Sequence, residues 1–292
     1  ESEPQTGGRA DNSVINAKSA GLVIIGDEVL KGKVEECNSA FALQALRRVG
    51  VPVDRVSIVR DDIDEIAEEI RAQSDRHDIV VTSGGVGPTH DDVTIKAVAR
   101  AFGVPVSHNH ELEARIRAFA KLEEGGALTD AQRAMCRLPD AACLMNIPGD
   151  EKGWPILRTG NVFILPGIPQ YFRSKMEAIA THFVRGEAAV TRQVSLSLDE
   201  NSLVPAIDAV VGRHPQVSVG SYPFVDGGPA RTIVTFEVPQ GREAEVDAAV
   251  EDFVREAGEH VISVEDSDSL VREGVGAGED AGGAAKAGRA KL

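Results

Sequence analysis

Short apolar runs alternate with helical patterns through the first half of the chain. Strand-like runs occupy residues 21–25, 53–59 and 79–81, and each is followed by apolar residues that recur every three or four positions. Such close alternation of strand and helix predicts a parallel sheet with right-handed crossovers and helices on both faces. In sheets of this kind, ligands bind at the carboxyl ends of the strands.

Capping residues mark the ends of the helices that follow the first two strands. Asn38 stands where an N-cap is expected and Gly50 stands at the C′ position, which gives this helix about three turns. Asp61 and Asp62 are candidate caps for the next helix, whose apolar residues continue to Ile70. Local signals therefore agree with the periodicity.

The pattern continues beyond the third strand, with one less regular stretch. Helices are expected over residues 112–123 and 129–135, irregular chain over residues 139–154, and a further strand over residues 161–165. The turn Pro166-Gly167-Ile168-Pro169 ends that strand and precedes a helix over residues 170–182. A third strand-to-helix turn thus points to the same sheet edge.

A second, smaller α/β domain is predicted over residues 190–265. Its expected elements are strands at 190–198, 232–238 and 261–262, and helices at 201–211 and 243–256. Residues 1–19 lack periodicity and predict a flexible N-terminus, while the Gly- and Ala-rich residues 266–292 predict a disordered tail. The larger domain then spans residues 20–189.

The charge of the chain limits its partners. Of the formal net charge of −15, the tail from Asp266 carries only −1, because it holds five acidic and four basic residues. An acidic body of this kind argues against binding nucleic acid or an anionic membrane through a basic face. A polyphosphate ligand would need local compensation from loop amides, a few basic side chains or a metal ion.

Cysteine usage and hydropathy bear on the compartment. Cys37, Cys136 and Cys143 are an odd set without a Cys-x-x-Cys pair, which predicts reduced thiols rather than disulfides or a zinc knuckle. No apolar run approaches the roughly 20 residues of a membrane span, and no secretory segment opens the chain. We expect a cytoplasmic protein, although the start at Glu1 is also compatible with removal of an organellar targeting peptide.

The stretch from Thr82 to Thr94 carries the most chemical information. It reads Thr-Ser-Gly-Gly-Val-Gly-Pro-Thr-His-Asp-Asp-Val-Thr between a strand and a helix. Loop amides and the positive N-terminal end of a helix attract phosphate, and glycines let a ligand approach the backbone. The candidate phosphate-binding residues are Ser83, Gly84, Gly85, Gly87, Thr89 and His90. The dinucleotide fingerprint lacks its third glycine, and no acidic ribose-binding residue follows a second strand about 20 residues on, which disfavours a nicotinamide-dependent dehydrogenase. A Walker lysine followed by Ser or Thr is also absent.

Two pairs of carboxylates fall at the predicted ligand edge. Asp27 and Glu28 follow the first strand, and Asp91 and Asp92 follow the glycines. Facing carboxylates can bind a divalent ion such as Mg²⁺, Mn²⁺ or Co²⁺, which bridges pyrophosphate oxygens and readies a water for attack. The candidates are Asp27, Asp91 and Asp92 for the metal, and Asp27, Glu28 and Asp92 for catalysis. The alternatives are a solvated turn at the first pair and a helix cap at the second.

Three further features each allow a functional and a structural interpretation. Lys31 can contact phosphate or lie on the surface, and Gly167 can form a wall of the site or a plain strand-to-helix turn. His108 and His110 have a short metal-ligand spacing, but in a loop that opens a helix this spacing is more typical of a cap with solvated neighbours.

Three motifs in consistent order carry a family resemblance. They are Gly-Asp-Glu-Val-Leu-Lys-Gly at 26–32, the glycine-rich stretch at 82–94, and Leu-Pro-Gly-Ile-Pro at 165–169. From about Ala20 to His182 the chain resembles the molybdopterin-binding (MoCF/MogA-like) domain, in the version found in eukaryotic FAD synthase and in bacterial CinA proteins. The resemblance extends more weakly to residues 220–223 and the second domain.

The resemblance implies a three-layer α/β fold, with a mostly parallel sheet and a site for a phosphorylated pterin or nucleotide. In the FAD synthase and CinA branch it implies metal-dependent hydrolysis of a dinucleotide pyrophosphate, FAD to FMN and AMP in the former and ADP-ribose in the latter. The family pattern aligns Asp27 and Glu28 with its Gly-Asp-Glu turn, and the glycines at 84, 85 and 87 with its phosphate loop. It aligns Asp92 with its Asp-Val-Thr segment, which makes Asp92 the first choice for the metal.

Two functions follow as hypotheses. The leading one is a FAD- or ADP-ribose-type pyrophosphatase, and the other is a non-catalytic module that binds molybdopterin or a flavin nucleotide; a purely structural partner domain is a third, less favoured interpretation. No segment after Ser263 resembles the family's synthase domain, so we do not expect this chain alone to make FAD. Relatives with this fold commonly form dimers or trimers, so a homo-oligomer is expected.

Overall fold

The computed structural model describes residues 13–122, 126–223 and 228–266, which form two units. The division falls after Ala188. Most of the predicted flexible N-terminus and nearly all of the predicted tail lie outside the described residues. Near the end of the predicted flexible N-terminus (residues 1–19), residues 15–16 form a short strand, β1 (Ile15–Asn16). It pairs in parallel with β10 (Val184–Arg185).

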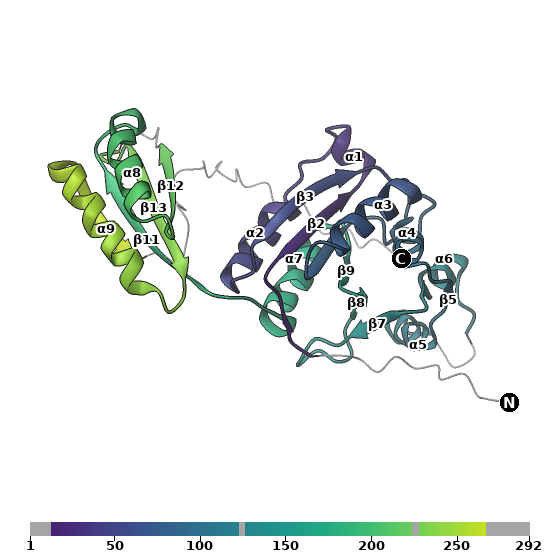
Figure 1. Ribbon diagram of the computed structural model, residues 1–292. Coiled ribbons are helices and arrows are strands. Elements are labelled where there is room, and N and C mark those ends of the chain that lie inside the picture. The colour runs from purple at the N-terminus through teal and green to yellow at the C-terminus, as the bar shows by residue number, and fades with distance from the viewer. Residues whose placement is uncertain (1–12, 123–125, 224–227, 267–292) are drawn as a thin grey trace, which may run out of the picture. The chain divides into compact units, whose positions relative to one another are not determined.

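The first unit is built on a six-stranded sheet. Its strands, in spatial order, are β3 (Val53–Val59), β2 (Ala20–Ile25), β4 (Ile79–Ser83), β9 (Val162–Leu165), β8 (Ile156–Thr159) and β7 (Ala142–Met145). The first four run parallel, and β8 and β7 are antiparallel additions at one edge (Figure 1). Because the four parallel strands end at one edge, the segments that follow them lie side by side there.

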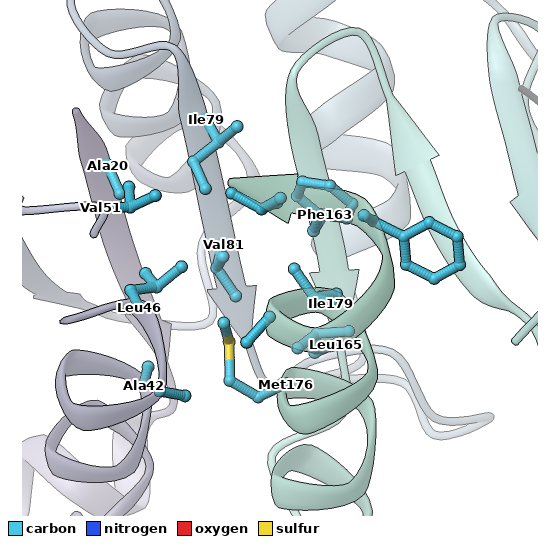
Figure 2. Packing of buried hydrophobic residues seen from close by; sticks show 14 of the residues in the cluster. Ala20, Ala42, Leu46, Val51, Ile79, Val81, Phe163, Leu165, Met176 and Ile179 are labelled. Atoms are coloured by element: carbon cyan, nitrogen blue, oxygen red, sulfur yellow. The ribbon is translucent and has the colours of Figure 1, made fainter. Parts of the chain in front are cut away.

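Helices cover both faces of this sheet, which confirms the predicted three layers. Helices α2 (Asn38–Arg48) and α7 (Pro169–Ala178) pack on one face, and α3 (Ile63–Ser74), α4 (Thr94–Phe102) and α5 (His110–Phe119) contribute to the core on the other. Strand β4 shows how alternation serves both cores, since Val81 points to the first and Val80 to the second. Figure 2 shows Leu46 of α2 and Met176 of α7 converging on the first core beside Val81.

The middle of the chain departs from the sequence prediction. Residues 139–154, predicted to be irregular, contain β7, while β5 (Val106–His108) pairs antiparallel with β6 (Arg137–Pro139). Strands of three or four residues are too short to show a period of two, so only their partners reveal them. Helix α6 (Asp130–Met135) lies as predicted, and α7 continues into a π-helical segment over Ile179–Phe183.

The second unit has ferredoxin-like topology. Its elements are β11 (Ala189–Leu196), α8 (Glu200–Arg213), β12 (Ser218–Pro223), β13 (Thr232–Pro239), α9 (Glu243–Ala257), a 3₁₀ turn (Gly258–His260) and β14 (Val261–Asp266). The strands form an antiparallel sheet in the order β12-β13-β11-β14, which is the arrangement of a split β-α-β unit. The sequence prediction missed β12, because glycine and proline are poor strand formers. No helix among the described residues is both long and apolar enough to cross a membrane.

Candidate functional site

The predicted motifs meet at the carboxyl edge of the parallel strands. The Gly-Asp-Glu turn follows β2 and forms a one-turn helix, α1 (Asp27–Leu30), rather than an open turn. The glycine-rich loop follows β4, and the Pro166 to Pro169 turn follows β9. Because β4 lies between β2 and β9, the glycine-rich loop is flanked by the other two motifs.

Glycines in this region let the strand ends approach one another closely. Gly84 has φ 112°, and a Cβ there would lie 2.1 Å from the carbonyl oxygen of Ile25 at the end of β2. A Cβ on Gly167 would lie 3.2 Å from the Cα of Gly84. The two glycines therefore bring backbones into contact, in addition to any role toward a ligand.

Asn38 ties the strand ends together, which corrects its predicted role as an N-cap. Helix α2 begins at Asn38, and Glu36 Oε1 accepts from the backbone N–H of Asn38 at 2.7 Å and from that of Ser39 at 3.0 Å. The Asn38 side chain instead donates to Ser83 Oγ at 2.9 Å and to the Gly167 carbonyl at 2.8 Å. Asn38 is only 5% exposed, and its Oδ1 atom has no hydrogen-bond partner among the described residues. A buried acceptor without a partner is a group that a ligand donor would satisfy.

An open, charged cleft of about 550 Å³ lies beside these strand ends. It is lined by Asp27, Glu28, Lys31, Lys33, Arg60, Asp61, Asp62, His90 and Asp91. Five carboxylates stand against three permanently cationic side chains, so the cleft carries an excess of two negative charges. A phosphate ligand would be repelled from this cleft unless a cation accompanied it.

Asp27 and Asp61 are the most closely connected acids of the cleft. Asp61 Oδ2 accepts from the backbone N–H of Asp27 at 2.8 Å, and Asp27 pairs with Lys31 one turn further along. The hydrogen bond from Lys31 lowers the pKa of Asp27. Burial raises the pKa of Asp61, and the charges of Glu28, Asp27 and Asp91 raise it further. Several carboxylates held close together in this way are typical of a functional site, because their mutual repulsion does not stabilise the fold.

The carboxylates that follow the glycines, Asp91 and Asp92, accept hydrogen bonds from Thr89 in their own loop. Asp92 Oδ2 accepts from the Thr89 backbone N–H at 2.7 Å and from Thr89 Oγ1 at 2.6 Å, and Asp91 also accepts from that hydroxyl. Neither acid caps α4, because its N-cap residue is Val93 and the helix has no side-chain cap hydrogen bond. The helix-cap alternative is therefore wrong. Asp91 faces the cleft, whereas Asp92 braces the loop and is absent from the lining.

The structure thus separates the predicted site residues into two groups. Those that line the cleft are Asp27, Glu28, Lys31, His90 and Asp91; those at the strand ends and in the loop are Ser83, Gly84, Gly85, Gly87, Thr89, Asp92 and Gly167. His90 is 97% exposed in its side chain, so it is free to meet a ligand. The prediction missed Arg60, Asp61 and Asp62 as site residues. Their position directly after β3, beside the end of β2, was the signal that could have found them.

Replacing Asp61 by Asn should stabilise the protein at neutral pH. A carboxyl whose pKa is higher in the folded than in the unfolded state destabilises the fold as pH rises through that window, from about 3.9 upward. The amide oxygen of the introduced asparagine can still accept from the Asp27 N–H, so we expect Asp61→Asn to raise Tm by about 1 to 3 °C at pH 7 in EDTA.

Thermal unfolding at several pH values checks this expectation. The gain should shrink as pH falls toward about 4, where the wild-type carboxyl takes up its proton. Asp54→Asn, at the opposite end of β3 and exposed, is the matched control. A Tm at pH 7 no higher than that of the wild type would contradict the account of Asp61.

Comparison with known proteins agrees with this fold. Residues 21–186 match the family model described as a probable molybdopterin binding domain. This chain therefore belongs to the molybdopterin-binding domain family. Residues 188–266 match the FAD synthase middle domain, so a molybdopterin-binding domain is followed along the chain by a FAD synthase-like domain, as the sequence resemblance implied.

Several known proteins are similar to this chain. A probable FAD synthase of Caenorhabditis elegans is 29% identical over 249 residues, which cover 78% of this chain and 48% of the relative. The chain spans about half the length of this relative and of its Caenorhabditis briggsae counterpart. A protein of Archaeoglobus fulgidus is 31% identical over 80% of this chain and 95% of its own length. The solved structure of the protein CinA from Thermoplasma acidophilum is 31% identical, with a TM-score of 0.49, over 58% of this chain and 97% of that one.

Proposed function

We propose that this chain hydrolyses the pyrophosphate bond of a nucleotide diphosphate, with FAD as the first candidate and ADP-ribose as the second. The observation that carries the proposal is the position of an acidic cleft directly beside a glycine-rich loop, at the ends of β2, β3 and β4. The FAD synthase-like arrangement of both units supports a flavin nucleotide as the ligand. With FAD, a water would attack one phosphorus and the P–O–P bond would break, to give FMN and AMP.

The residues of the cleft fit a hard divalent ion. Asp27, Asp61 and Asp91 supply carboxylate oxygens, the ligands that Mg²⁺ and Mn²⁺ prefer. Among the described residues, no three cleft carboxylates have oxygens within 4.8 Å of one another, so they do not form a closed cage. Mg²⁺ usually takes one or two carboxylates together with waters and substrate phosphates. When bound, such an ion supplies charge neutralisation at the phosphates and a water of lowered pKa.

The side chains of the cleft have separable tasks under this proposal. Lys31 is paired with Asp27, and Arg60 with Glu65 at 2.7 Å. The Lys33 ammonium makes no hydrogen bond or ion pair with any described residue and is therefore the cation available to a phosphate. Asp92 would act as a positioning residue, because it holds Thr89 and thereby the loop that carries Asp91.

Removing the Lys33 charge should weaken substrate binding. We expect Lys33→Ala to raise KM for FAD about tenfold with kcat changed less, because a charge-assisted contact to phosphate contributes about 1.5 kcal/mol or more. Steady-state kinetics at constant ionic strength measures both constants. Lys152→Ala removes an exposed lysine outside the cleft lining and is the matched control. Equal KM values for the two variants would exclude Lys33 as a phosphate contact.

A substrate panel tests the proposed activity. FAD and ADP-ribose are each incubated with the full chain and Mg²⁺, Mn²⁺ or Co²⁺, and FMN is included as a phosphate monoester without a pyrophosphate bond. We expect cleavage of a diphosphate substrate and none of FMN. Cleavage of FMN at the same rate would indicate a general phosphatase instead.

The buried acceptor on Asn38 also favours the second function, a binding module for molybdopterin or a flavin nucleotide. An Oδ1 atom without a partner among the described residues invites a ligand donor at the strand ends but does not require hydrolysis. A pure binding module would show a higher Tm with ligand and no product. An unchanged Tm with every ligand would exclude this function.

A further inference from the structure

A second cluster of metal-binding side chains lies outside the acidic cleft, where β5 passes into α5. His108 is the last residue of β5, and His110 and Glu113 lie in the first turn of α5. One ligand atom from each of these residues lies within 4.8 Å of those of the other two. None of the three lines the acidic cleft.

The local fold fixes the backbone at these three residues. His108 is paired with Arg137 across the β5–β6 ladder, and the intervening Asn109 donates its backbone N–H to the Cys136 carbonyl at 2.7 Å. The Asn109 side chain accepts from the Leu112 N–H at 2.8 Å and so fixes the start of α5. His110 and Glu113 are three residues apart and therefore share a helix face.

The contacts of Glu113 resemble those that orient a metal-binding carboxylate. Its Oε1 atom accepts from Arg117 Nε at 2.7 Å, while Oε2 lies 2.5 Å from Nε2 of His108. The two imidazole rings are exposed, with centroids 4.9 Å apart, so both can rotate and both are accessible from solvent.

We propose that His108, His110 and Glu113 form a binding site for a divalent first-row transition ion, with Zn²⁺ as the preferred ion. Two imidazoles and a carboxylate are a donor set for zinc, and three protein ligands leave a fourth position for water. Ligand atoms in a tetrahedral zinc site lie about 3.3 Å apart, given bonds of about 2.0–2.1 Å. The cleft, in contrast, offers carboxylate oxygens, which suit Mg²⁺.

The basic residues nearby do not oppose such a site. Arg117 is engaged by Glu113, and Arg137 donates to the Val106 carbonyl through Nη2. His108 also contacts Glu113, and the simplest alternative is that this is an ordinary His–Glu ion pair with no bound metal. A bound ion would join β5 to α5 through three side chains. The two alternatives differ in a measurable affinity for Zn²⁺.

Titration of the full, chelator-treated chain with Zn²⁺ separates the alternatives. The variants are His110→Ala, which removes an exposed side chain, and Glu113→Gln; the matched control is Glu111→Gln, an exposed acid in the same helical turn. Asp27→Asn is included to identify any Zn²⁺ held by the cleft. Co²⁺ serves as an optical probe, because tetrahedral coordination by nitrogen and oxygen gives visible absorption bands. Circular dichroism verifies that each variant is folded.

We expect one Zn²⁺ site that weakens at least about 100-fold in His110→Ala, since removal of a direct ligand should exceed the 10- to 100-fold effect of outer-shell changes. Glu113→Gln should weaken it as well, while Glu111→Gln and Asp27→Asn should leave it unchanged. Equal Zn²⁺ affinity in His110→Ala and the wild type would overturn the proposal. So would binding that is lost in Asp27→Asn, because the ion would then belong to the cleft.

Discussion

Asp27→Asn is expected to lower kcat/KM for FAD hydrolysis by about 100-fold or more. Asp27 follows β2, lines the cleft and donates its backbone N–H to the Asp61 carboxylate, which makes it our first choice for holding a divalent ion there. Asparagine keeps the shape and removes the charge, and a metal-assisted reaction loses several kcal/mol of transition-state stabilisation with the ion. Initial rates at saturating Mg²⁺ or Mn²⁺ measure the effect.

Two variants separate loss of the ion from other effects of this change. Lys31→Ala breaks the Asp27–Lys31 pair but leaves the carboxylate, and an exposed pair of this kind contributes little to stability. Asp54→Asn removes a carboxylate at the other end of β3. We expect both to retain most of the activity at saturating substrate. If Asp27→Asn were as active as Asp54→Asn, Asp27 would not belong to the catalytic site.

Gly84→Ala is expected to destabilise the first unit by about 3 kcal/mol or more. The new Cβ would lie 2.1 Å from the Ile25 carbonyl oxygen, and Gly84 has φ 112°, a conformation that L residues rarely adopt. Overpacking and backbone strain each cost about 1–3 kcal/mol, and the strand ends cannot separate without disrupting the site. The expected fall in Tm is therefore about 6 °C or more.

Gly103→Ala is the matched control for this substitution. Gly103 also has positive φ, at 65°, but a Cβ there would meet nothing within 4 Å, so only a backbone cost of about 1 kcal/mol is expected. The single tryptophan, Trp154, lies in the first unit, and its fluorescence follows unfolding of that unit alone. If Gly84→Ala and Gly103→Ala unfold at the same temperature, the close packing around Gly84 does not add to the cost of the substitution.

The parts of the fold that depend on local chemistry could be predicted from the sequence. The strand at 53–59 has the predicted bounds, and Asp62 caps α3 by accepting from the N–H groups of Asp64 and Glu65. Gly50 stands at the predicted C′ position, directly after the C-cap Val49, and has φ 74°. The parallel order of the strands followed from alternation, and it correctly placed three motifs at one sheet edge.

The remainder depends on contacts between residues distant in sequence. Asn38 has the residue type of an N-cap, yet its side chain binds Ser83 and Gly167, which are 45 and 129 residues away. Asp61 and Asp62 are adjacent and appeared equivalent, but one caps a helix while the other turns to Asp27. The Asp92 side chain turns to Thr89, and nothing in the sequence distinguishes it from Asp91. Contacts between distant residues determine which way these side chains turn, and a local sequence pattern carries no information about such contacts.

The direct test of the central claim is hydrolysis of FAD by the full chain in water enriched in ¹⁸O. With Mg²⁺, Mn²⁺ or Co²⁺ present, we expect FMN and AMP in equal amounts, with one ¹⁸O atom in one of the two products. EDTA should abolish the reaction, and Asp27→Asn should lower kcat/KM about 100-fold or more. FAD that remains intact with all three ions, under conditions in which the chain is folded, would contradict the claim that this acidic cleft is a metal-dependent hydrolytic site.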